Sequence, residues 1–186
     1  MITVLVTGGF DPLHSGHLSY FRAARELGDY LVVGVNSDEW LAHKKGKPFM
    51  PLHERIEVVK HLWMVDEVIP VIDDEEGGTT RAIDHLLLQS PKKLIVANGG
   101  DRVDGEIPEQ RSYADHPDVH FVFGVGGVDK KNSSSLILED WSTELSQDLF
   151  SPSWVRTYVK MHKQHEANRT AWREREKNLR ALREAR

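Results

Sequence analysis

Two glycines and two histidines near the N-terminus are the residues of this chain best suited to phosphate chemistry. Gly8 and Gly9 end an apolar run, and His14 and His17 flank Gly16 where helical spacing begins. Glycines let backbone amides approach a ligand closely, and a helix N-terminus offers unpaired N–H groups and a favourable dipole to an anion. Each histidine can donate a hydrogen bond to a phosphate oxygen once its tautomer is set. The stretch therefore predicts a phosphate-binding site.

Alternating strand and helix patterns position this stretch in a larger fold. Short apolar, β-branched runs predict strands at residues 2–7, 30–36, 66–72, 92–98 and 119–125, and helices are predicted to begin near residues 15, 37, 51, 79 and 133. Pro70 places the third strand at a sheet edge or a strand end, because proline cannot donate to a central ladder. This order predicts an α/β fold with an open, doubly wound, parallel five-stranded sheet of the Rossmann-like type.

Composition narrows the classes of partner. The formal net charge is −5, which gives no general reason to expect a nucleic acid or a membrane surface as partner. The chain has no cysteine, so disulfides and thiolate metal sites are excluded. No apolar stretch approaches the roughly 18 residues needed to span a bilayer, and the N-terminus lacks a signal-peptide pattern. We therefore expect a soluble, cytoplasmic protein.

The composition changes near residue 150. Residues 1–150 predict the main domain, and residues 151–186, which are rich in Arg, Lys, Glu and Ala and lack glycine, predict a charged helical C-terminal extension. Its apolar stripe is sparse, so a solvated helix or a frayed tail is the favoured interpretation. A homodimer contact and a contact with a polyanion are the alternatives.

Further polar residues follow the carboxyl ends of the predicted strands, where an open α/β sheet binds its ligands. Three lysines, Lys44, Lys45 and Lys47, follow the second strand in a stretch expected to be flexible. The fourth strand ends at the glycine pair and aspartate of residues 99–101, and the fifth is followed by lysines and by the serines of residues 133–135. Serines at a helix start can cap the helix or bind phosphate. These strand ends predict one shared cleft.

The spacing of the histidine stretch resembles the signature of a known superfamily. The sequence GGFDPLHSGH at residues 8–17, placed between a strand and a helix, is similar to the signature of the cytidylyltransferase-like nucleotidyltransferases. The stretches at 28–33, 53–55, 66–68 and 99–101 resemble heptose-phosphate adenylyltransferases and glycerol-phosphate cytidylyltransferases. The resemblance covers roughly residues 2 to 141 and implies the nucleotidyltransferase version of the Rossmann-like fold.

The serine-rich helix start resembles the second signature of the same superfamily. Its form, SSSL at residues 133–136, is similar to the pantetheine-phosphate adenylyltransferases. Some cytidylyltransferases place an arginine before this signature, and here Lys130 and Lys131 lie nearby instead. The residue that binds phosphate at this point is therefore left open.

Roles for individual residues follow from charge and from this resemblance. Catalytic roles fall to His14, His17 and Lys44, with His17 the firmest assignment. Nucleotide binding falls to Gly8, Gly9, Phe10, Asp11, Gly99, Gly100, Asp101, Ser133, Ser134 and Ser135, and substrate-phosphate binding to Arg55, Lys45, Lys47 and Lys131. Three alternatives stay open. Arg55 could form a salt bridge across the cleft rim, Asp11 could fix the loop rather than orient a histidine or metal water, and residues 99–101 could form only a turn.

The reaction that these residues favour joins two anions. We expect transfer of a nucleoside monophosphate from a nucleoside triphosphate to a phosphorylated sugar or polyol, with in-line attack, release of pyrophosphate and no covalent intermediate. ATP is slightly preferred as donor. Mg²⁺ is expected to bind through the triphosphate, and no residue of the chain is assigned as a metal ligand.

Other functions compete with this one. A CTP-dependent glycerol-phosphate-type cytidylyltransferase is close behind, and adenylyl transfer to pantetheine phosphate or nicotinamide mononucleotide comes third. A non-catalytic nucleotide-binding module would use the same fold. The intact histidine pair argues against that module, because binding alone does not require both histidines.

Overall fold

The computed structural model describes residues 1–72, 79–99, 102, 107–127 and 133–147. Its strands are β1 (Ile2–Gly8), β2 (Tyr30–Asn36), β3 (Glu67–Val71), β4 (Lys93–Gly99) and β5 (Val119–Val125). Its helices are α1 (Ser15–Arg25), α2 (Asp38–Lys45), α3 (Leu52–Lys60), α4 (Thr80–Leu87), α5 (Pro108–Ser112) and α6 (Ser134–Gln147). The predicted extension at residues 151–186 lies outside the described residues. The chain divides into two compact units, Met1–Glu139 and Asp140–Arg186.

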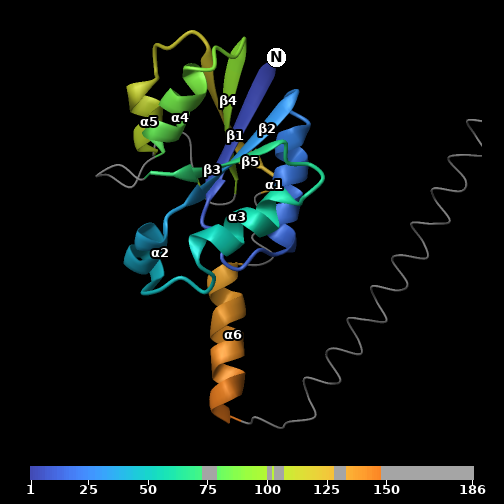
Figure 1. The fold of residues 1–186 in the computed structure, drawn as a ribbon, viewed down its shortest axis with the longest axis vertical. Helices are drawn as coiled ribbons and strands as arrows, with labels where there is room; N and C mark the ends of the chain where they lie inside the picture. Colours follow the sequence, from blue (N-terminus) through green and yellow to red (C-terminus); the bar gives the residue numbers. More distant parts are fainter. Residues whose placement is uncertain (73–78, 100–101, 103–106, 128–132, 148–186) are drawn as a thin grey trace, which may run out of the picture. The chain divides into compact units, whose positions relative to one another are not determined.

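The strands form one parallel sheet in the order β3-β2-β1-β4-β5. This confirms the predicted α/β fold with its five-stranded parallel sheet (Figure 1). Strand β1 lies at the centre, between β2 and β4, so the residues that follow it are flanked by the ends of both neighbours. Pro70 belongs to β3 at one edge of the sheet, as its missing N–H predicts.

Apolar side chains pack on both faces of the sheet. On one face, Val4 and Val6 of β1 join a cluster with Phe21 of α1 and Val59 of α3. On the other face, Leu5 joins a cluster that includes Ala82, Ile83 and Leu86 of α4. Alternate residues of β1 therefore serve opposite faces, which explains why the strand is apolar throughout. Figure 1 accordingly shows α1 and α3 on one side of the sheet and α4 and α5 on the other.

Two details differ from the sequence prediction. The basic residues Lys44 and Lys45, expected in a flexible stretch, form the last turn of α2, where cations complement the helix dipole. Ser37 caps the start of this helix by accepting from the Trp40 N–H, and Gly46 follows its end with φ 90°. Helix α5 was not predicted, because its five residues are too few to display a helical period.

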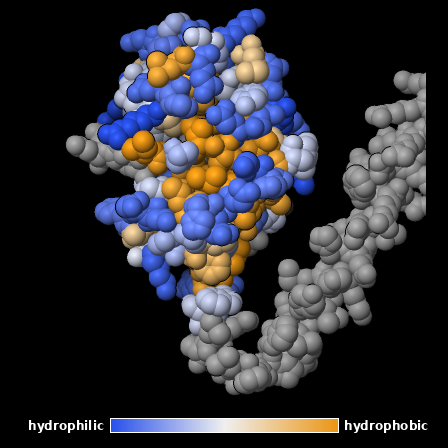
Figure 2. All heavy atoms as spheres, in the orientation of Figure 1, coloured by the Kyte–Doolittle hydropathy of each residue, from blue (hydrophilic) through white to orange (hydrophobic). Residues whose placement is uncertain are grey.

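The surface carries some apolar side chains. Figure 2 shows hydrophobic residues gathered across the middle of one face, over the region of β3 and α3 in Figure 1. Val58, Trp63 and Ile72 belong to these elements or follow them, and Trp63 is 79% exposed. None of the helices in the described part of the chain has the length and apolar character that crossing a bilayer requires.

Candidate active site

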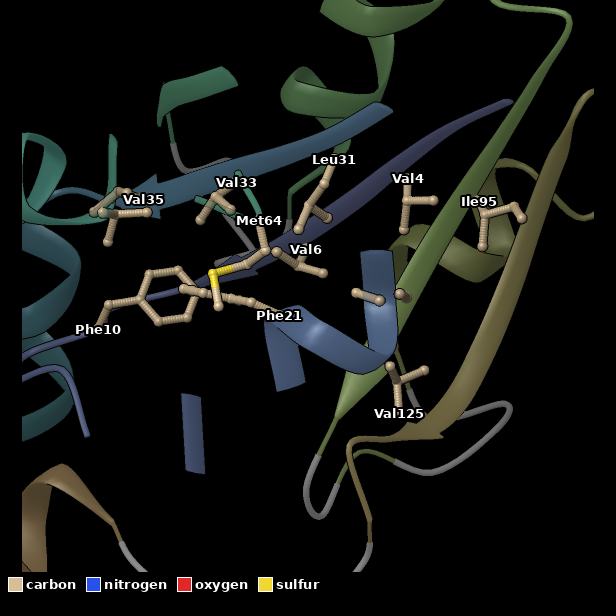
Figure 3. Packing of buried hydrophobic residues seen from close by; sticks show 13 residues of the cluster. Val4, Val6, Phe10, Phe21, Leu31, Val33, Val35, Met64, Ile95 and Val125 are labelled. Atoms are coloured by element: carbon tan, nitrogen blue, oxygen red, sulfur yellow. The ribbon is translucent and has the colours of Figure 1, made fainter. Parts of the chain in front are cut away.

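The loop after β1 is fixed by close packing on both sides. A Cβ atom at Gly9 would lie 2.7 Å from Leu41 Cδ2 of α2, so only glycine lets this helix pack against the loop. Phe10 has a positive φ of 49°, an uncommon conformation for a residue with a side chain. Its ring is buried against Phe21, with 4.9 Å between ring centroids, and lies beside Met64 in Figure 3. Burial of the ring therefore stabilises the strained turn.

The two histidines cap the helix that they begin. His14 Nδ1 accepts from the Gly16 N–H at 3.1 Å, and His17 Nδ1 accepts from the His14 N–H at 3.3 Å. This reciprocal arrangement is a capping box in which imidazole nitrogens replace the usual oxygens. A ring nitrogen that accepts carries no proton, so the donors assign the Nε2–H tautomer to both rings. The rings stack with their centroids 3.7 Å apart.

The environment keeps both imidazoles neutral. Burial and the neighbouring His14 lower the pKa of His17 to about 3, and burial also lowers the pKa of His14. Protonation of either Nδ1 would remove a capping acceptor, so capping and burial favour the same neutral state. Each ring therefore offers its Nε2–H as the remaining donor beside the N-terminus of α1, which suits an anionic ligand.

Asp11 fixes the loop to a distant segment. Its carboxylate is 1% exposed and accepts from the backbone N–H groups of Phe49 and Met50, each at 2.7 Å. Lys45 Nζ completes the set at 2.7 Å. Of the roles considered for Asp11, these contacts match fixing the loop. Lys45, expected to bind a substrate phosphate, forms this ion pair with Asp11 in the structure.

Arg55 is placed differently from the phosphate-binding role expected of it. Its side chain is fully buried and donates to the backbone carbonyls of Met50, Gly9 and Asn36. Its remaining described bond is a 2.6 Å ion pair with Asp38. Burial raises the pKa of Asp38, and hydrogen bonds from Arg55 and the Leu52 N–H outweigh this and lower it. The structure corrects the expectation, because the guanidinium joins the ends of β1 and β2 instead of facing a ligand.

A cavity of about 860 Å³ lies at the carboxyl ends of β1, β2 and β4. The predicted site residues that line it are Gly8, Gly9, Phe10, Asp11, His14, His17, Lys44, Lys45, Gly99, Ser133, Ser134 and Ser135. Arg55 and Lys47 are not among its lining residues. Gly100, Asp101 and Lys131 lie outside the described residues. The strand-end rule therefore brought most of the described candidates into one cavity.

On the α2 side of β1, the cavity wall carries Trp40 and Lys44. Lys44 is exposed and its Nζ lies 4.5 Å from the centroid of the Trp40 ring, a cation–π contact. Trp40 also lies close to Gly9, since a Cβ there would be 3.6 Å from Trp40 Cζ3. Lys44 is thus placed at the cavity by a helix that packs on the glycine loop.

On the β4 side, the wall contains residues that the sequence prediction missed. Arg102 lines the cavity and donates to Asn98 Oδ1 at 3.1 Å. Tyr20 of α1 donates its hydroxyl to the Ala97 carbonyl, and a Cβ at Gly99 would lie 2.8 Å from its ring. Burial raises the pKa of Tyr20, and the charge of Arg102 lowers it in part. Arg102 was detectable, because it follows the predicted Gly-Gly-Asp turn directly, whereas Tyr20 resembles any helical core residue.

The serines at the start of α6 contact the same site. Ser133 Oγ accepts from the Leu136 N–H at 3.1 Å, which is a helix cap. Ser134 Oγ donates to the Pro12 carbonyl at 2.9 Å and so ties this helix start to the histidine loop. The capping role considered for the triplet is therefore observed for Ser133, and all three serines line the cavity.

The residues around the cavity suit a metal that arrives with its ligand. Within the described residues, no group of three or more His, Cys, Asp or Glu side chains could bind a metal ion. Asp11, the buried carboxylate of the cavity lining, already accepts from two backbone N–H groups and Lys45. The other groups identified here are donors or cations, which fit phosphate oxygens. This donor set is compatible with Mg²⁺ bound through phosphates.

Solved structures share this fold. The crystal structure of the lipopolysaccharide core biosynthesis protein from Thermoplasma volcanium GSS1 is 27% identical, with a TM-score of 0.56, and the match covers 69% of this chain and 99% of that one. A bifunctional NMN adenylyltransferase/ADP ribose pyrophosphatase from Francisella tularensis matches with a TM-score of 0.50 at 15% identity, over 81% of this chain and 43% of that one. The second match shows the fold alone.

Curated relatives match part of the chain. Ethanolamine-phosphate cytidylyltransferase from Arabidopsis thaliana is 53% identical over 68 residues, which are 37% of this chain and 16% of that protein. Bifunctional protein HldE from Photorhabdus laumondii subsp. laumondii is 41% identical over 106 residues, 56% of this chain and 21% of that protein. The chain thus spans about a fifth of the length of these relatives or less.

A family model extends this agreement. The model described as cytidylyltransferase-like matches residues 5–122, which is more than half of the chain. The match spans the sheet from β1 into β5 and includes the histidine stretch. It confirms the resemblance drawn from residues 8–17: the chain belongs to the cytidylyltransferase-like family.

Proposed function

We propose that this chain is a nucleotidyltransferase that transfers a nucleoside monophosphate from a nucleoside triphosphate to the phosphate of a small acceptor. The observation that carries the proposal is the stacked, neutral histidine pair, whose Nε2–H groups lie at the N-terminus of α1 in a cavity of about 860 Å³. Neutral donors and a helix N-terminus stabilise phosphate charge without acting as a base or a nucleophile.

The chemistry requires positioning and charge stabilisation. An oxygen of the acceptor phosphate attacks the α-phosphorus, a new P–O bond forms, and the bond from the α-phosphorus to the bridging oxygen breaks. Pyrophosphate leaves with the electron pair of that bond. His14 and His17 donate to oxygens of the α- and β-phosphates, and Lys44 binds phosphate from the α2 side. Mg²⁺ bound to the triphosphate would neutralise part of its charge.

The acceptor that we propose is a phosphorylated sugar, polyol or amino alcohol. The names of the matched proteins include an ethanolamine-phosphate cytidylyltransferase and a lipopolysaccharide core biosynthesis protein, which support a small phosphorylated alcohol and a sugar derivative respectively. The resemblance to heptose-phosphate adenylyltransferases favours ATP as donor. CTP is the alternative, and the 53% identity to the cytidylyltransferase supports it.

The direct test is product formation. The protein is incubated with Mg²⁺, each of ATP, CTP, GTP and UTP, and a panel of sugar phosphates, glycerol phosphate, ethanolamine phosphate and pantetheine phosphate. We expect pyrophosphate release and a nucleotide-linked product, detected by mass spectrometry, for one donor and one acceptor class. Triphosphate binding without pyrophosphate release from any pair would instead support the non-catalytic binding module.

Two further properties remain proposals. A homodimer is supported by the exposed apolar side chains of Val58, Trp63 and Ile72, and sedimentation would measure the mass of the particle. A mass equal to the 21.2 kDa chain would contradict it. A cytoplasmic location is the other, and fractionation of the source cell would test it.

A further inference from the structure

Basic side chains at and beside the cavity differ in their partners. Lys45 pairs with Asp11 at 2.7 Å, and Arg55 pairs with Asp38 at 2.6 Å. Arg102 differs, because its partner within the described residues is the neutral amide oxygen of Asn98. No carboxylate of the described part of the chain forms a salt bridge with it. Its positive charge is therefore not neutralised by these residues.

The position of Arg102 is nevertheless well defined. Asn98, which accepts from it, is 2% exposed at the end of β4, so the anchoring amide is held by the sheet. The guanidinium is half-buried and uses one N–H group in this bond, which leaves other groups of its planar fork to meet a ligand. An anchored, incompletely neutralised arginine in a cavity is suited to a phosphate group.

The topology separates two anion subsites. In an in-line displacement, the attacking oxygen and the leaving pyrophosphate lie on opposite sides of the α-phosphorus. The histidine pair follows β1, whereas Lys44 follows β2 and Arg102 follows β4, on opposite sides of β1 in the sheet. One side therefore suits the acceptor phosphate and the other suits the pyrophosphate.

The β4 side has the larger set of phosphate donors. Arg102 shares the cavity with the hydroxyls of the serines at 133–135, and Ser134 donates to the Pro12 carbonyl of the histidine loop. The α2 side contributes Lys44, whereas the ammonium of Lys45 is paired with Asp11. Pyrophosphate has more oxygens to satisfy than a single acceptor phosphate, so the wall with the arginine and serines fits it better.

We propose that Arg102 binds the pyrophosphate half of the nucleoside triphosphate, anchored by Asn98 and acting together with the serines at the start of α6. This proposal rests on the proposed function, and it identifies the phosphate ligand that the sequence left open beside the serine signature. Arg102 is a binding residue in this account, and the acceptor phosphate binds on the opposite side, near Lys44.

The test compares ligands that contain or lack this group. Calorimetry measures the affinity of wild type, Arg102→Gln and Arg102→Lys for Mg²⁺-pyrophosphate, ATP, CTP, AMP and CMP. We expect Arg102→Gln to weaken pyrophosphate and the preferred triphosphate roughly 10- to 100-fold, the range for a lost charge-assisted bond, and to leave the monophosphate unchanged. Arg102→Lys should fall between, because lysine keeps the charge and loses the fork. Arg111→Gln, on the exposed surface of α5, is the matched control and should equal wild type.

Each other outcome decides the proposal. Wild-type affinities in Arg102→Gln, or an equal loss for monophosphate and triphosphate with an unchanged melting temperature, would overturn it. If wild type forms no product with any acceptor but loses pyrophosphate affinity on Arg102→Gln, the proposed function fails and this inference stands. If wild type binds neither pyrophosphate nor any triphosphate, both are overturned.

Discussion

The two sides of the β1 loop use positive charge in different ways. On the α2 and α3 side, Lys45 and Arg55 each pair with a carboxylate and with backbone carbonyls, and both connect segments distant in sequence. On the β4 side, Arg102 is bound to a neutral amide, and the histidine pair is neutral and offers N–H donors. The paired cations stabilise the loop, and the donors that lack a carboxylate partner among the described residues are suited to bind the ligand.

This difference explains how a loop with two glycines keeps a defined shape. The Gly9 carbonyl accepts from Arg55, the Asp11 carboxylate accepts from residues 49 and 50, and the Phe10 ring enters the core. Three consecutive residues are thus tied to three separate partners. The histidines that follow are positioned by this framework and by their own capping bonds.

Breaking the paired side should produce the largest effect. Arg55→Ala removes the donor for three backbone carbonyls and the partner of Asp38, and leaves a void in place of a fully buried side chain. We expect a loss of about 3–5 kcal/mol in the free energy of unfolding, measured by urea denaturation. The control is Arg25→Ala, which breaks a half-exposed pair with Asp66 and should cost about 1 kcal/mol or less. Equal effects of the two variants would contradict the structural role of Arg55.

Removing a donor should affect turnover more than stability. His17→Ala is expected to lower kcat roughly 100- to 1000-fold, the effect of losing one preorganised donor to a developing charge, and to cost about 1 kcal/mol of stability through the lost cap. His17→Gln is the matched variant, because glutamine at this helix position can still accept from the capped N–H. It should restore the stability and leave turnover low. Near-normal turnover in His17→Ala would remove His17 from the mechanism.

The neutral state of His17 predicts a smaller, pH-dependent effect. Its pKa is about 3 in the folded chain against 6.5 unfolded, so between these values the unfolded chain binds a proton that the folded chain does not. Stability should therefore fall as the pH is lowered below 6.5, by up to about 1.4 kcal/mol per pH unit from this residue. Urea unfolding of wild type and His17→Gln between roughly pH 5 and 6 measures the difference in slope. Identical slopes would mean that His17 titrates normally in the folded state.

The sequence predicted the parts of this arrangement that depend on local pattern. The apolar runs gave the strands, Ser37 marked the start of α2, Pro70 marked the edge strand, and glycines followed by a histidine pair marked the phosphate site. Each of these follows from residue type and spacing within a few positions. The order of strands then brought the candidates that follow β1, β2 and β4 to one cavity.

The pairing of charges could not be predicted in this way. Arg55 and Lys45 have the composition of surface residues, and only the tertiary structure shows that their partners lie 17 and 34 residues away. A buried arginine is recognised by its acceptors, which are backbone carbonyls with no sequence signal. The same holds for Arg102, whose importance depends on the neutral partner that it meets.

The most direct measurement is thermal stability in the presence of Mg²⁺ and each nucleoside triphosphate, for wild type and His17→Ala. A triphosphate at about a hundred times its dissociation constant should stabilise wild type by roughly 2.7 kcal/mol. The account predicts this shift with one donor, ATP or CTP, and a much smaller shift with the same donor in His17→Ala. No shift of wild type with any triphosphate would contradict the assignment of the cavity to a nucleotide.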